Sequence, residues 1–323
     1  FVEFHKDVLA ELHQRHELLQ TSSLVYRPMI APPELHTELA SGGYIHREMR
    51  KPMVQRFKSS YFDDQTVQKF SKPSKKVINS LNGLMLTEWS VNEEVKEVME
   101  NLFKNNTGLA NLPYYSFEEF MYTETYPNDG DKVEKAIWCQ RRQAAWSDWY
   151  KQEQSRGRML IRLQLCKDLK KYNYFYHVFT LDFRGRAYTS CELLSPQSSD
   201  FDKALACFAN GVQVNETGRY WQKINVANLF DQDNLSLDER VKWTEDNWEM
   251  LKRIKEDPYS NKEWIDSRKK KNKSFQRLAA VLDTLREDGM SYVPVQIDGN
   301  CNGSQHWSAI MRDQDVGEKV GIV

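Results

Sequence analysis

The chain has 323 residues, of which 40% are hydrophobic and 28% are charged, as in a globular protein with a sizeable core. Its 45 basic and 46 acidic residues leave a net charge of -1, which excludes a histone-like polycation but not a nucleic-acid-binding protein, because basic residues can cluster locally. No run of about 18 apolar residues and no signal peptide occurs, so we expect a cytoplasmic protein without a membrane-spanning helix.

The cysteine pattern does not indicate a disulfide framework or a structural zinc site. The five cysteines are scattered, none forms a C-x-x-C pair and their number is odd. A reducing compartment fits this pattern better than a secreted location. His13 and His16 are three residues apart, but a metal site usually needs further cysteine or acidic ligands, so we interpret them as surface residues.

Hydrophobic periodicity predicts two helices in the first hundred or so residues. Apolar residues recur at a near-helical period in residues 1–26 and again in residues 76–104. Prolines between positions 28 and 33 end the first helix and begin an irregular stretch. Residues 114–131 are aromatic, acidic and turn-rich, which predicts a long surface loop or hinge.

Residues 132–171 give the strongest helical pattern, and they are strongly basic. Their apolar side chains recur at four-residue and seven-residue spacing. Together with Asp131, the segment carries eleven Lys or Arg residues, Arg141 and Arg142 among them, against five Asp or Glu residues. Such a helix presents either a solvated face or a surface that lies along a phosphate backbone, where basic side chains displace counterions.

Residues 174–190 alternate apolar and polar side chains and predict two strands joined by a turn. The turn reads Asp-Phe-Arg-Gly-Arg at residues 182–186. Gly185 permits a close backbone approach, and the guanidinium groups of Arg184 and Arg186 can grip phosphate oxygens bidentately. The same residues also fit an ordinary turn with a structural Asp–Arg pair.

The C-terminal part of the chain predicts helices followed by a strand and a loop of small residues. Residues 216–256 are mostly helical in pattern, and a short strand is expected at residues 292–297. Asp298 follows at the end of that strand, and a further helix is predicted to begin near Gly303. Three apolar residues are expected on the buried face of this helix: Trp307, Ile310 and Met311.

Asp298 is a candidate metal ligand because small residues leave open space around its carboxylate. The backbone carbonyl of Gly299 can reach the same ion. Magnesium prefers oxygen ligands and keeps several waters, and a pair of such ions can clamp the oxygens of a phosphoryl transfer. Asp-Gly-Asn is also ordinary turn chemistry, and an Asp or Asn before a helix is an ordinary cap.

Taken together, these segments resemble the phage-type single-subunit RNA polymerases, a family that includes the T-odd phage and mitochondrial enzymes. Residues 182–186 match the family's D-x-x-G-R element, and Tyr188 matches the aromatic residue after it. Residues 298–306 are similar to palm motif A, written D-G-S-C-S-G-x-Q-H in the phage members. The order and separation of the motifs agree, and the resemblance covers most of the chain, most specifically after residue 170.

The resemblance implies an α+β, mainly helical fold with the right-hand architecture of polymerases, incomplete in this chain. Residues 1–75 would form an N-terminal helix and an irregular segment. Residues 76–174 would form thumb-like helices, and residues 175–323 would form part of the palm.

The resemblance also implies site residues. Asp298 would be the catalytic carboxylate and, with the carbonyl of Gly299, would bind two catalytic Mg²⁺ ions. Lys242 would approach the incoming ribonucleoside triphosphate. Contacts with the DNA template and the RNA transcript would come from the D-x-x-G-R segment and the basic helix: Arg184, Arg186, Tyr188, Arg141 and Arg142.

The family's fingers helix and its H-D-S motif, with the second metal-binding Asp, are not in this sequence, which ends at Val323 soon after motif A. One carboxylate cannot assemble a two-metal centre, so we expect either a fragment of a longer chain or a polymerase whose partner chain supplies these groups. A split enzyme would be similar to the heterodimeric RNA polymerase of the phage N-four group, which acts in the host-cell cytoplasm.

Two other functions remain open at this point. The chain could be a non-catalytic clamp subunit that keeps the basic helix and the D-x-x-G-R segment only to bind nucleic acid. It could also belong to a DNA polymerase of the same right-hand class, because sugar selection depends partly on a fingers tyrosine that this sequence lacks. Gln305 and His306 favour the RNA-making branch by resemblance.

Overall fold

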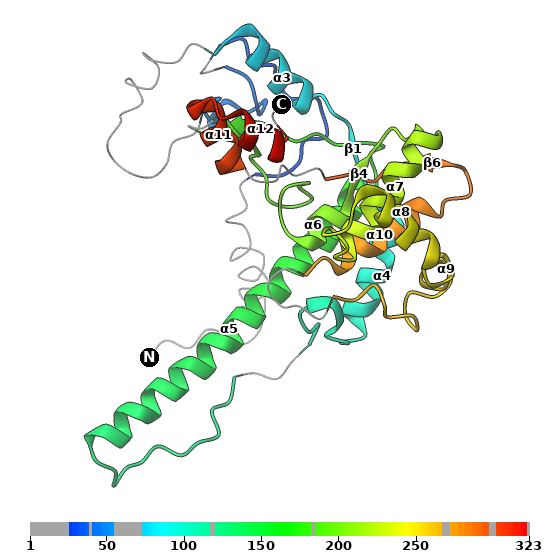
Figure 1. Ribbon diagram of the computed structural model, residues 1–323. Coiled ribbons are helices and arrows are strands. Elements are labelled where there is room, and N and C mark those ends of the chain that lie inside the picture. The colour runs from blue at the N-terminus through cyan, green and yellow to red at the C-terminus, as the bar shows by residue number, and fades with distance from the viewer. Residues whose placement is uncertain are drawn as a thin grey trace. The chain divides into compact units, whose positions relative to one another are not determined.

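The computed structural model describes residues 26–38, 41–54, 73–116, 120–182, 185–266, 272–296 and 302–321. The chain forms two compact units, Phe1–Val293 and Pro294–Val323 (Figure 1). The described part is mainly helical with small antiparallel sheets, which confirms the predicted α+β, mainly helical class. Residues 1–25, which hold most of the first predicted helix with His13 and His16, lie outside the described residues.

The prediction of continuous helix over residues 76–104 is wrong, because a strand interrupts it. Three elements occupy this range: α3 (Lys75–Met85), β1 (Trp89–Val91) and α4 (Glu93–Lys104). The Asn92 side chain accepts a hydrogen bond from the amide of Val95 and so starts a new helix. β1 pairs antiparallel with β4, Ala206–Phe208, far along the chain. The interruption therefore depends on a tertiary contact that local periodicity does not reveal.

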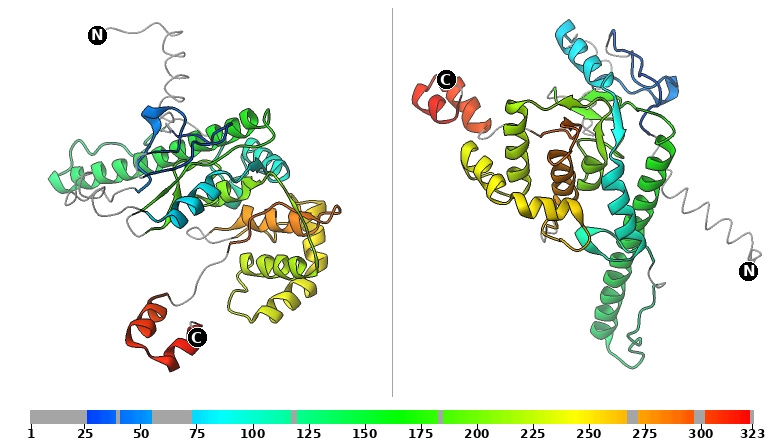
Figure 2. Two further views of the ribbon diagram at one scale, coloured as in Figure 1. Left: turned by 90° about the horizontal axis from the view of Figure 1, so that it is seen from above. Right: turned by 90° about the vertical axis from the view of Figure 1, so that its right-hand side faces the viewer.

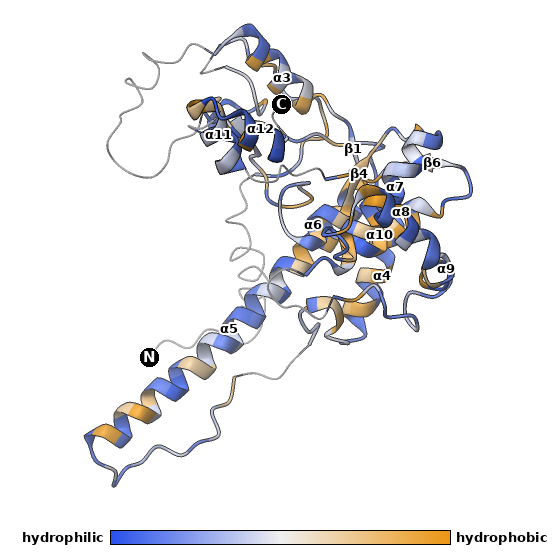
Figure 3. Ribbon diagram, in the orientation of Figure 1, coloured by the Kyte–Doolittle hydropathy of each residue, from blue (hydrophilic) through white to orange (hydrophobic). Residues whose placement is uncertain are grey.

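α5, Lys132–Leu169, is the long helix predicted from residues 132–171. The Asp131 carboxylate caps its N-terminus by accepting hydrogen bonds from the amides of Val133 and Glu134. Its buried residues all lie from Met159 onward. The remainder of the helix extends away from the core of the first unit and is largely hydrophilic (Figures 1 and 3).

The segment before α5 packs along the exposed half of this helix. The loop predicted at residues 114–131 is irregular wherever it is described. Tyr122 and Tyr126 lie edge-on to the Trp138 indole, with ring centroids 5.3 and 5.0 Å away. Trp138 Nε1 donates a hydrogen bond to the carbonyl of Glu124 at 3.0 Å. These contacts with α5 account for part of the aromatic content of the loop.

Two further antiparallel strand pairs accompany β1 and β4. They are β2 (Phe179–Leu181) with β3 (Ala187–Thr189), and β5 (Val212–Gln213) with β6 (Met290–Ser291). The β2–β3 pair confirms the strand–turn–strand prediction within residues 174–190. The strand expected at residues 292–297 is absent from its described part, which ends at residue 296. Pro294 has no N–H to donate to a ladder, which disfavours continuation of β6.

The main hydrophobic core packs α4 and the buried end of α5 against helices from the second half of the first unit. These helices are α6 (Asp200–Leu205), α7 (Glu216–Leu229), α8 (Leu237–Asp246), α9 (Trp248–Glu256) and α10 (Ser274–Thr284). α7, α8 and α9 confirm the predicted helical region. Every residue of α10 except Gln276 is buried, because α6, α7 and α9 all pack on it (Figure 2).

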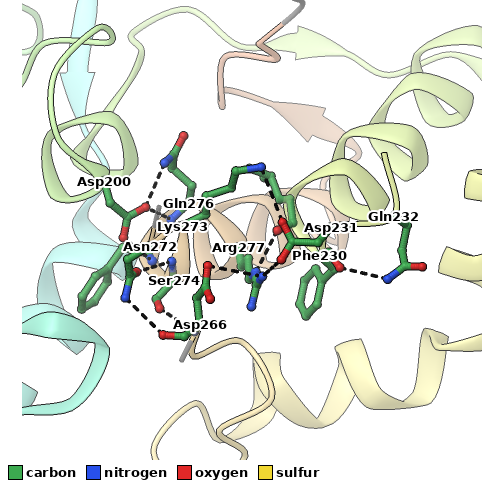
Figure 4. A network of polar contacts seen from close by, with 12 residues as sticks. Asp200, Phe230, Asp231, Gln232, Asp266, Asn272, Lys273, Ser274, Gln276 and Arg277 are labelled. Carbon is green, nitrogen blue, oxygen red and sulfur yellow. Dashed lines mark hydrogen bonds and ion pairs between the residues drawn. The ribbon is translucent and has the colours of Figure 1, made fainter. Parts of the chain in front are cut away.

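A polar network holds the N-terminus of α10 (Figure 4). The carboxylate of Asp200, from α6, accepts hydrogen bonds from the amides of Phe275 at 2.9 Å and Gln276 at 3.1 Å. Burial raises the pKa of Asp200, although these hydrogen bonds act in the opposite direction. Arg277 donates to Asp231 at 2.6 Å. The network joins three segments that are distant in the chain.

A smaller core joins β2 to α3 and to the chain before it. Leu81 and Met85 of α3 lie in one buried cluster with Phe179 and Leu181 of β2, and Ala187 packs against it. Two short 3-10 helices complete the described elements of the first unit: η1 (Arg47–Met49) and η2 (Leu109–Asn111).

The second unit contains two short helices, α11 (Asn302–Met311) and α12 (Gln314–Lys319). α11 confirms the helix predicted near Gly303. The prediction of its buried face is wrong, because Trp307, Ile310 and Met311 are 66%, 72% and 69% exposed. Two helices this short do not provide enough packing surface to bury the apolar face of α11. Among the described helices of the chain, none is both long and apolar enough to cross a membrane.

Candidate nucleic-acid interface

The β2–β3 hairpin carries the D-x-x-G-R segment at its turn. The Asp182 amide donates to the Arg186 carbonyl at 2.9 Å, and the Gly185 amide donates to the Asp182 carbonyl at 3.0 Å. The Asp182 carboxylate also accepts a hydrogen bond from the Arg186 amide at 2.9 Å. Gly185 has a φ of +81°, a left-handed conformation that other residues adopt only at a cost, so this turn favours glycine. Arg184 lies outside the described residues.

Arg186 and Tyr188 are exposed on the β3 side of this hairpin, whereas Thr180, opposite Tyr188 in β2, is buried. Leu181 is opposite Ala187 in the strand register, and both belong to the side that packs on the smaller core. Because side chains alternate along a strand, Arg186 and Tyr188 point the other way. Arg186 is exposed, and Tyr188 is 41% exposed. A guanidinium beside an aromatic ring can bind a phosphate and contact a base or a sugar.

The outer edge of β3 is covered by a side chain instead of a strand. Gln197 Oε1 accepts a hydrogen bond from the Thr189 amide at 2.9 Å, and its Nε2 donates to the Ala187 carbonyl at 2.8 Å. The Ser195 hydroxyl accepts from the Gln197 amide at 3.1 Å and lies 2.6 Å from the Thr189 hydroxyl. Sequence reasoning assigned no role to Gln197. The available signals were an amide side chain in the loop after a strand and the similarity of residues 195–197 to the pattern between the two motifs of the phage-type polymerases, which gives no role.

A buried ion pair connects this loop to α5. Arg162 Nε and Nη2 donate to the two carboxylate oxygens of Asp202 at 2.7 and 2.9 Å. The two side chains are 8% and 2% exposed. Asp202 Oδ1 also accepts from the amide of Leu194 at 3.0 Å, and the Leu194 carbonyl accepts from His177 Nε2 at 2.8 Å. Leu194 has a φ of +53°, which is unusual for leucine, and these two hydrogen bonds hold it there.

Sequence reasoning counted Arg162 among the basic residues of an exposed helix, which is wrong for this position. Arg162 follows Met159 by three residues and precedes Cys166 by four, and all three are buried. This spacing places them on one face of α5. The apolar residues at these positions were the signal that could have identified Arg162 as part of the core-facing side.

Other basic residues near the buried end of α5 are also engaged within the protein. Lys167 lies 3.0 Å from Glu100, and Lys170 lies 3.3 Å from Glu93. Burial by itself would raise the pKa of Glu100, but hydrogen bonds from Lys104 and Lys167 outweigh it and lower this pKa to about 2. The positive charge at this end of the helix therefore compensates acidic residues of α4.

Arg141 and Arg142 lie on the exposed half of α5. The Arg141 side chain is 66% exposed, and its guanidinium is 3.8 Å from Glu124, a surface pair of small energetic weight. The Arg142 guanidinium lies 5.7 Å from the centre of the Trp138 ring. Both guanidiniums therefore remain accessible to a phosphate backbone.

Lys242 is carried by a different part of the first unit. It is exposed on α8, which packs on α7 and α9, whereas the hairpin packs on α3. Its neighbour Val241 lines a cavity of about 500 Å³ between α7 and α8. Lys223 and Glu245, which also line this cavity, form an ion pair at 2.5 Å. The described contacts do not join Lys242 to the hairpin residues.

Asp298 and Gly299 lie outside the described residues, so no contact of the predicted metal ligands can be given. Within the described part of the chain, no three His, Cys, Asp or Glu side chains cluster as metal ligands would. Burial raises the pKa of the Cys166, Cys191 and Cys207 thiols to about 12. These three thiols are therefore protonated and unreactive at neutral pH.

Over most of its length, this chain is similar to known DNA-directed RNA polymerases. Residues 212–323 match the family model of DNA-dependent RNA polymerase. The chain is 27% identical over 305 residues to the mitochondrial DNA-directed RNA polymerase 1B of Nicotiana tabacum, covering 92% of this chain and 30% of that relative. It is 26% identical over 322 residues to T7 RNA polymerase of Escherichia phage T7, covering 93% and 34%.

A third relative gives the same result. The chain is 26% identical over 338 residues to the DNA-directed RNA polymerase of Enterobacteria phage T3, covering 98% of this chain and 35% of that relative. Together these similarities show that the chain resembles DNA-directed RNA polymerases of phages and of plant mitochondria. The chain spans about a third of the length of the curated relatives that it matches.

Proposed function

We propose that this chain forms part of a DNA-dependent RNA polymerase and takes part in template-directed nucleotidyl transfer from ribonucleoside triphosphates. The match of residues 212–323 to this polymerase family carries the proposal, because that range includes Asp298 and motif A. Arg186 and Tyr188, which are exposed just before β3 and within it, support it independently. In this proposal, residues 76–174 belong to the thumb and residues 175–323 to the palm of a right-hand polymerase.

Two Mg²⁺ ions are the cofactors that we assign to this activity. The Asp298 carboxylate and the Gly299 carbonyl would hold them, and oxygen donors of this kind suit magnesium. When bound, the ions supply charge neutralisation between the attacking and leaving oxygens. The Lys242 ammonium binds the triphosphate and opposes its negative charge.

We assign the nucleic-acid contacts to the β2–β3 hairpin and to the exposed half of α5, both in the first unit. Arg184, Arg186 and Tyr188 of the hairpin position the template strand and the hybrid. Arg141 and Arg142, on the exposed half of α5, contact the phosphate backbone of the RNA–DNA hybrid. Because such contacts release counterions, affinity should decrease steeply as salt concentration increases.

We further propose a second polypeptide that carries the fingers and the other palm Asp. In a split enzyme of this kind, this chain alone is inactive, and the complex acts in the cytoplasm, that of the host cell if a phage encodes it. The mass of the purified complex tests this proposal. A stoichiometric second chain is expected, and an active polymerase that contains this chain within one longer polypeptide would contradict the split arrangement.

Replacing Asp298 by asparagine in the purified polymerase tests the assigned chemistry. The substitution removes a negative charge from the proposed metal ligand, so primed-template elongation should decrease by about 10²-fold or more, while template affinity stays within about twofold. Asp313→Asn is the matched control. Asp313 caps α12 by accepting from the Val316 amide at 3.1 Å, and asparagine can also cap.

Two outcomes would count against this assignment. Elongation near the wild-type rate in Asp298→Asn contradicts the metal-binding role of Asp298. Salt-dependent template binding by a wild-type complex that never elongates a primer would instead favour the non-catalytic clamp.

A further inference from the structure

We propose that Gln197 is a positioning residue, which orients the β2–β3 hairpin toward nucleic acid and is itself anchored by the buried Arg162–Asp202 pair. The inference rests on the proposed function for its ligand, but its geometry does not depend on that function. Gln197 acts through the backbone of β3 and not through contact with the ligand.

The edge of β3 explains why a glutamine suits this position. Backbone groups of successive residues in a strand point alternately to its two edges. Tyr188 directs its N–H and carbonyl toward Thr180 of β2, so the Thr189 N–H and the Ala187 carbonyl on either side point outward. A further strand would present one acceptor and one donor to these two groups. The Gln197 amide presents both, at 2.9 and 2.8 Å. A carboxylate supplies only an acceptor, and an apolar side chain supplies neither.

Hydrogen bonds to buried groups hold the loop that carries Gln197. The Leu194 amide donates a hydrogen bond to the Asp202 carboxylate, which also accepts hydrogen bonds from Nε and Nη2 of Arg162. The left-handed conformation of Leu194 turns the chain sharply just before Ser195, whose hydroxyl accepts from the Gln197 amide. Leu194 and Ser195 are 0% and 1% exposed, so this anchor is part of the packed interior.

These contacts form a continuous connection between α5 and the hairpin. It runs from Arg162 through Asp202, the Leu194 backbone and Gln197 to the edge of β3. α5 also carries Arg141 and Arg142. The connection therefore fixes the position of the hairpin relative to α5. The two surfaces proposed to bind one nucleic acid thus keep a constant separation.

Hydrogen exchange of the wild-type chain and its variants tests the geometry without any assumption about polymerase activity. In Gln197→Ala, the Thr189 amide loses its acceptor and should exchange about 10-fold faster. Gln197→Glu keeps that acceptor but cannot donate to the Ala187 carbonyl, so its exchange should lie between alanine and wild type. Gln164→Ala, which removes an exposed hydrogen bond to Asp168, is the matched control and should leave Thr189 unchanged.

Binding of a short RNA–DNA hybrid tests the consequence. Gln197→Ala should weaken binding by about 3- to 10-fold, in the same direction as Arg186→Ala, while Gln164→Ala binds as wild type does. Unchanged Thr189 exchange in Gln197→Ala would overturn the proposal. So would undiminished binding by Gln197→Ala when Arg186→Ala binds poorly. If Arg186→Ala also binds normally, the proposed nucleic-acid contact fails, and the exchange rates alone decide whether Gln197 holds the hairpin.

Discussion

Replacing Arg162 by alanine is expected to lower the free energy of unfolding by about 3–5 kcal/mol. The substitution leaves the Asp202 carboxylate, which is 1% exposed, without its bidentate cation in the core. The amide of Leu194 and the hydroxyl of Ser199 remain as its donors, but neither carries a positive charge. Denaturant unfolding of the wild-type and variant chains gives this difference directly.

Two variants separate this effect from a general effect of changing α5. Arg162→Lys keeps the charge but cannot form two parallel hydrogen bonds, so an intermediate loss is expected. Lys151→Ala removes a surface pair with Asp148 in which both side chains are more than two-thirds exposed (68% and 77%), and its effect should be below about 0.5 kcal/mol. Equal losses in Arg162→Ala and Lys151→Ala would show that the buried pair contributes no more than a surface pair.

Acidification from about pH 6.5 to about pH 4 is expected to destabilise the chain through His177. Burial lowers the pKa of His177 to about 4, and its Nδ1 has no hydrogen-bond partner among the described residues. An unfolded histidine has a pKa of about 6.5, so between these values the unfolded state binds a proton that the folded state does not. Stability therefore falls as the pH falls, by about 3 kcal/mol for a difference of this size.

The pH dependence of a His177→Gln variant tests this assignment. Glutamine can still donate a hydrogen bond toward the Leu194 carbonyl but does not titrate, so the slope of stability against pH should flatten between pH 6.5 and pH 4. His46→Gln, at an exposed position, should keep the wild-type slope. An unchanged slope in His177→Gln would assign the acid sensitivity to other groups, such as His36, whose pKa burial also lowers.

Part of the candidate site followed from the sequence, because its signals are local. The turn at residues 182–186 needs a left-handed residue, and Gly185 provides it, so the hairpin and its exposed Arg186 could be predicted. The support behind the hairpin could not. Gln197 lies in a loop without periodicity, and its two hydrogen bonds are to backbone atoms, which carry no sequence signal.

The sequence by itself determined the helices with strong periodicity and clear caps. α5 begins after Asp131, whose carboxylate fits an N-cap, and it runs for 38 residues without proline. α7 and α8, which are capped by the side chains of Asn215 and Ser236, follow the same rule. Each of these elements depends on hydrogen bonds and side-chain spacing within a few residues, and a single sequence records such short-range relations.

Only the tertiary structure decided which faces of these elements are buried. Arg162 enters the core because Asp202, 40 residues away, offers two carboxylate oxygens in the right geometry. β1 forms between two helical patterns because β4 lies beside it. Trp307 stays exposed in spite of an amphipathic pattern, because no described element of its own unit covers it. Burial depends on which distant segments meet, and the free energy of those contacts is not a property of any local stretch of chain.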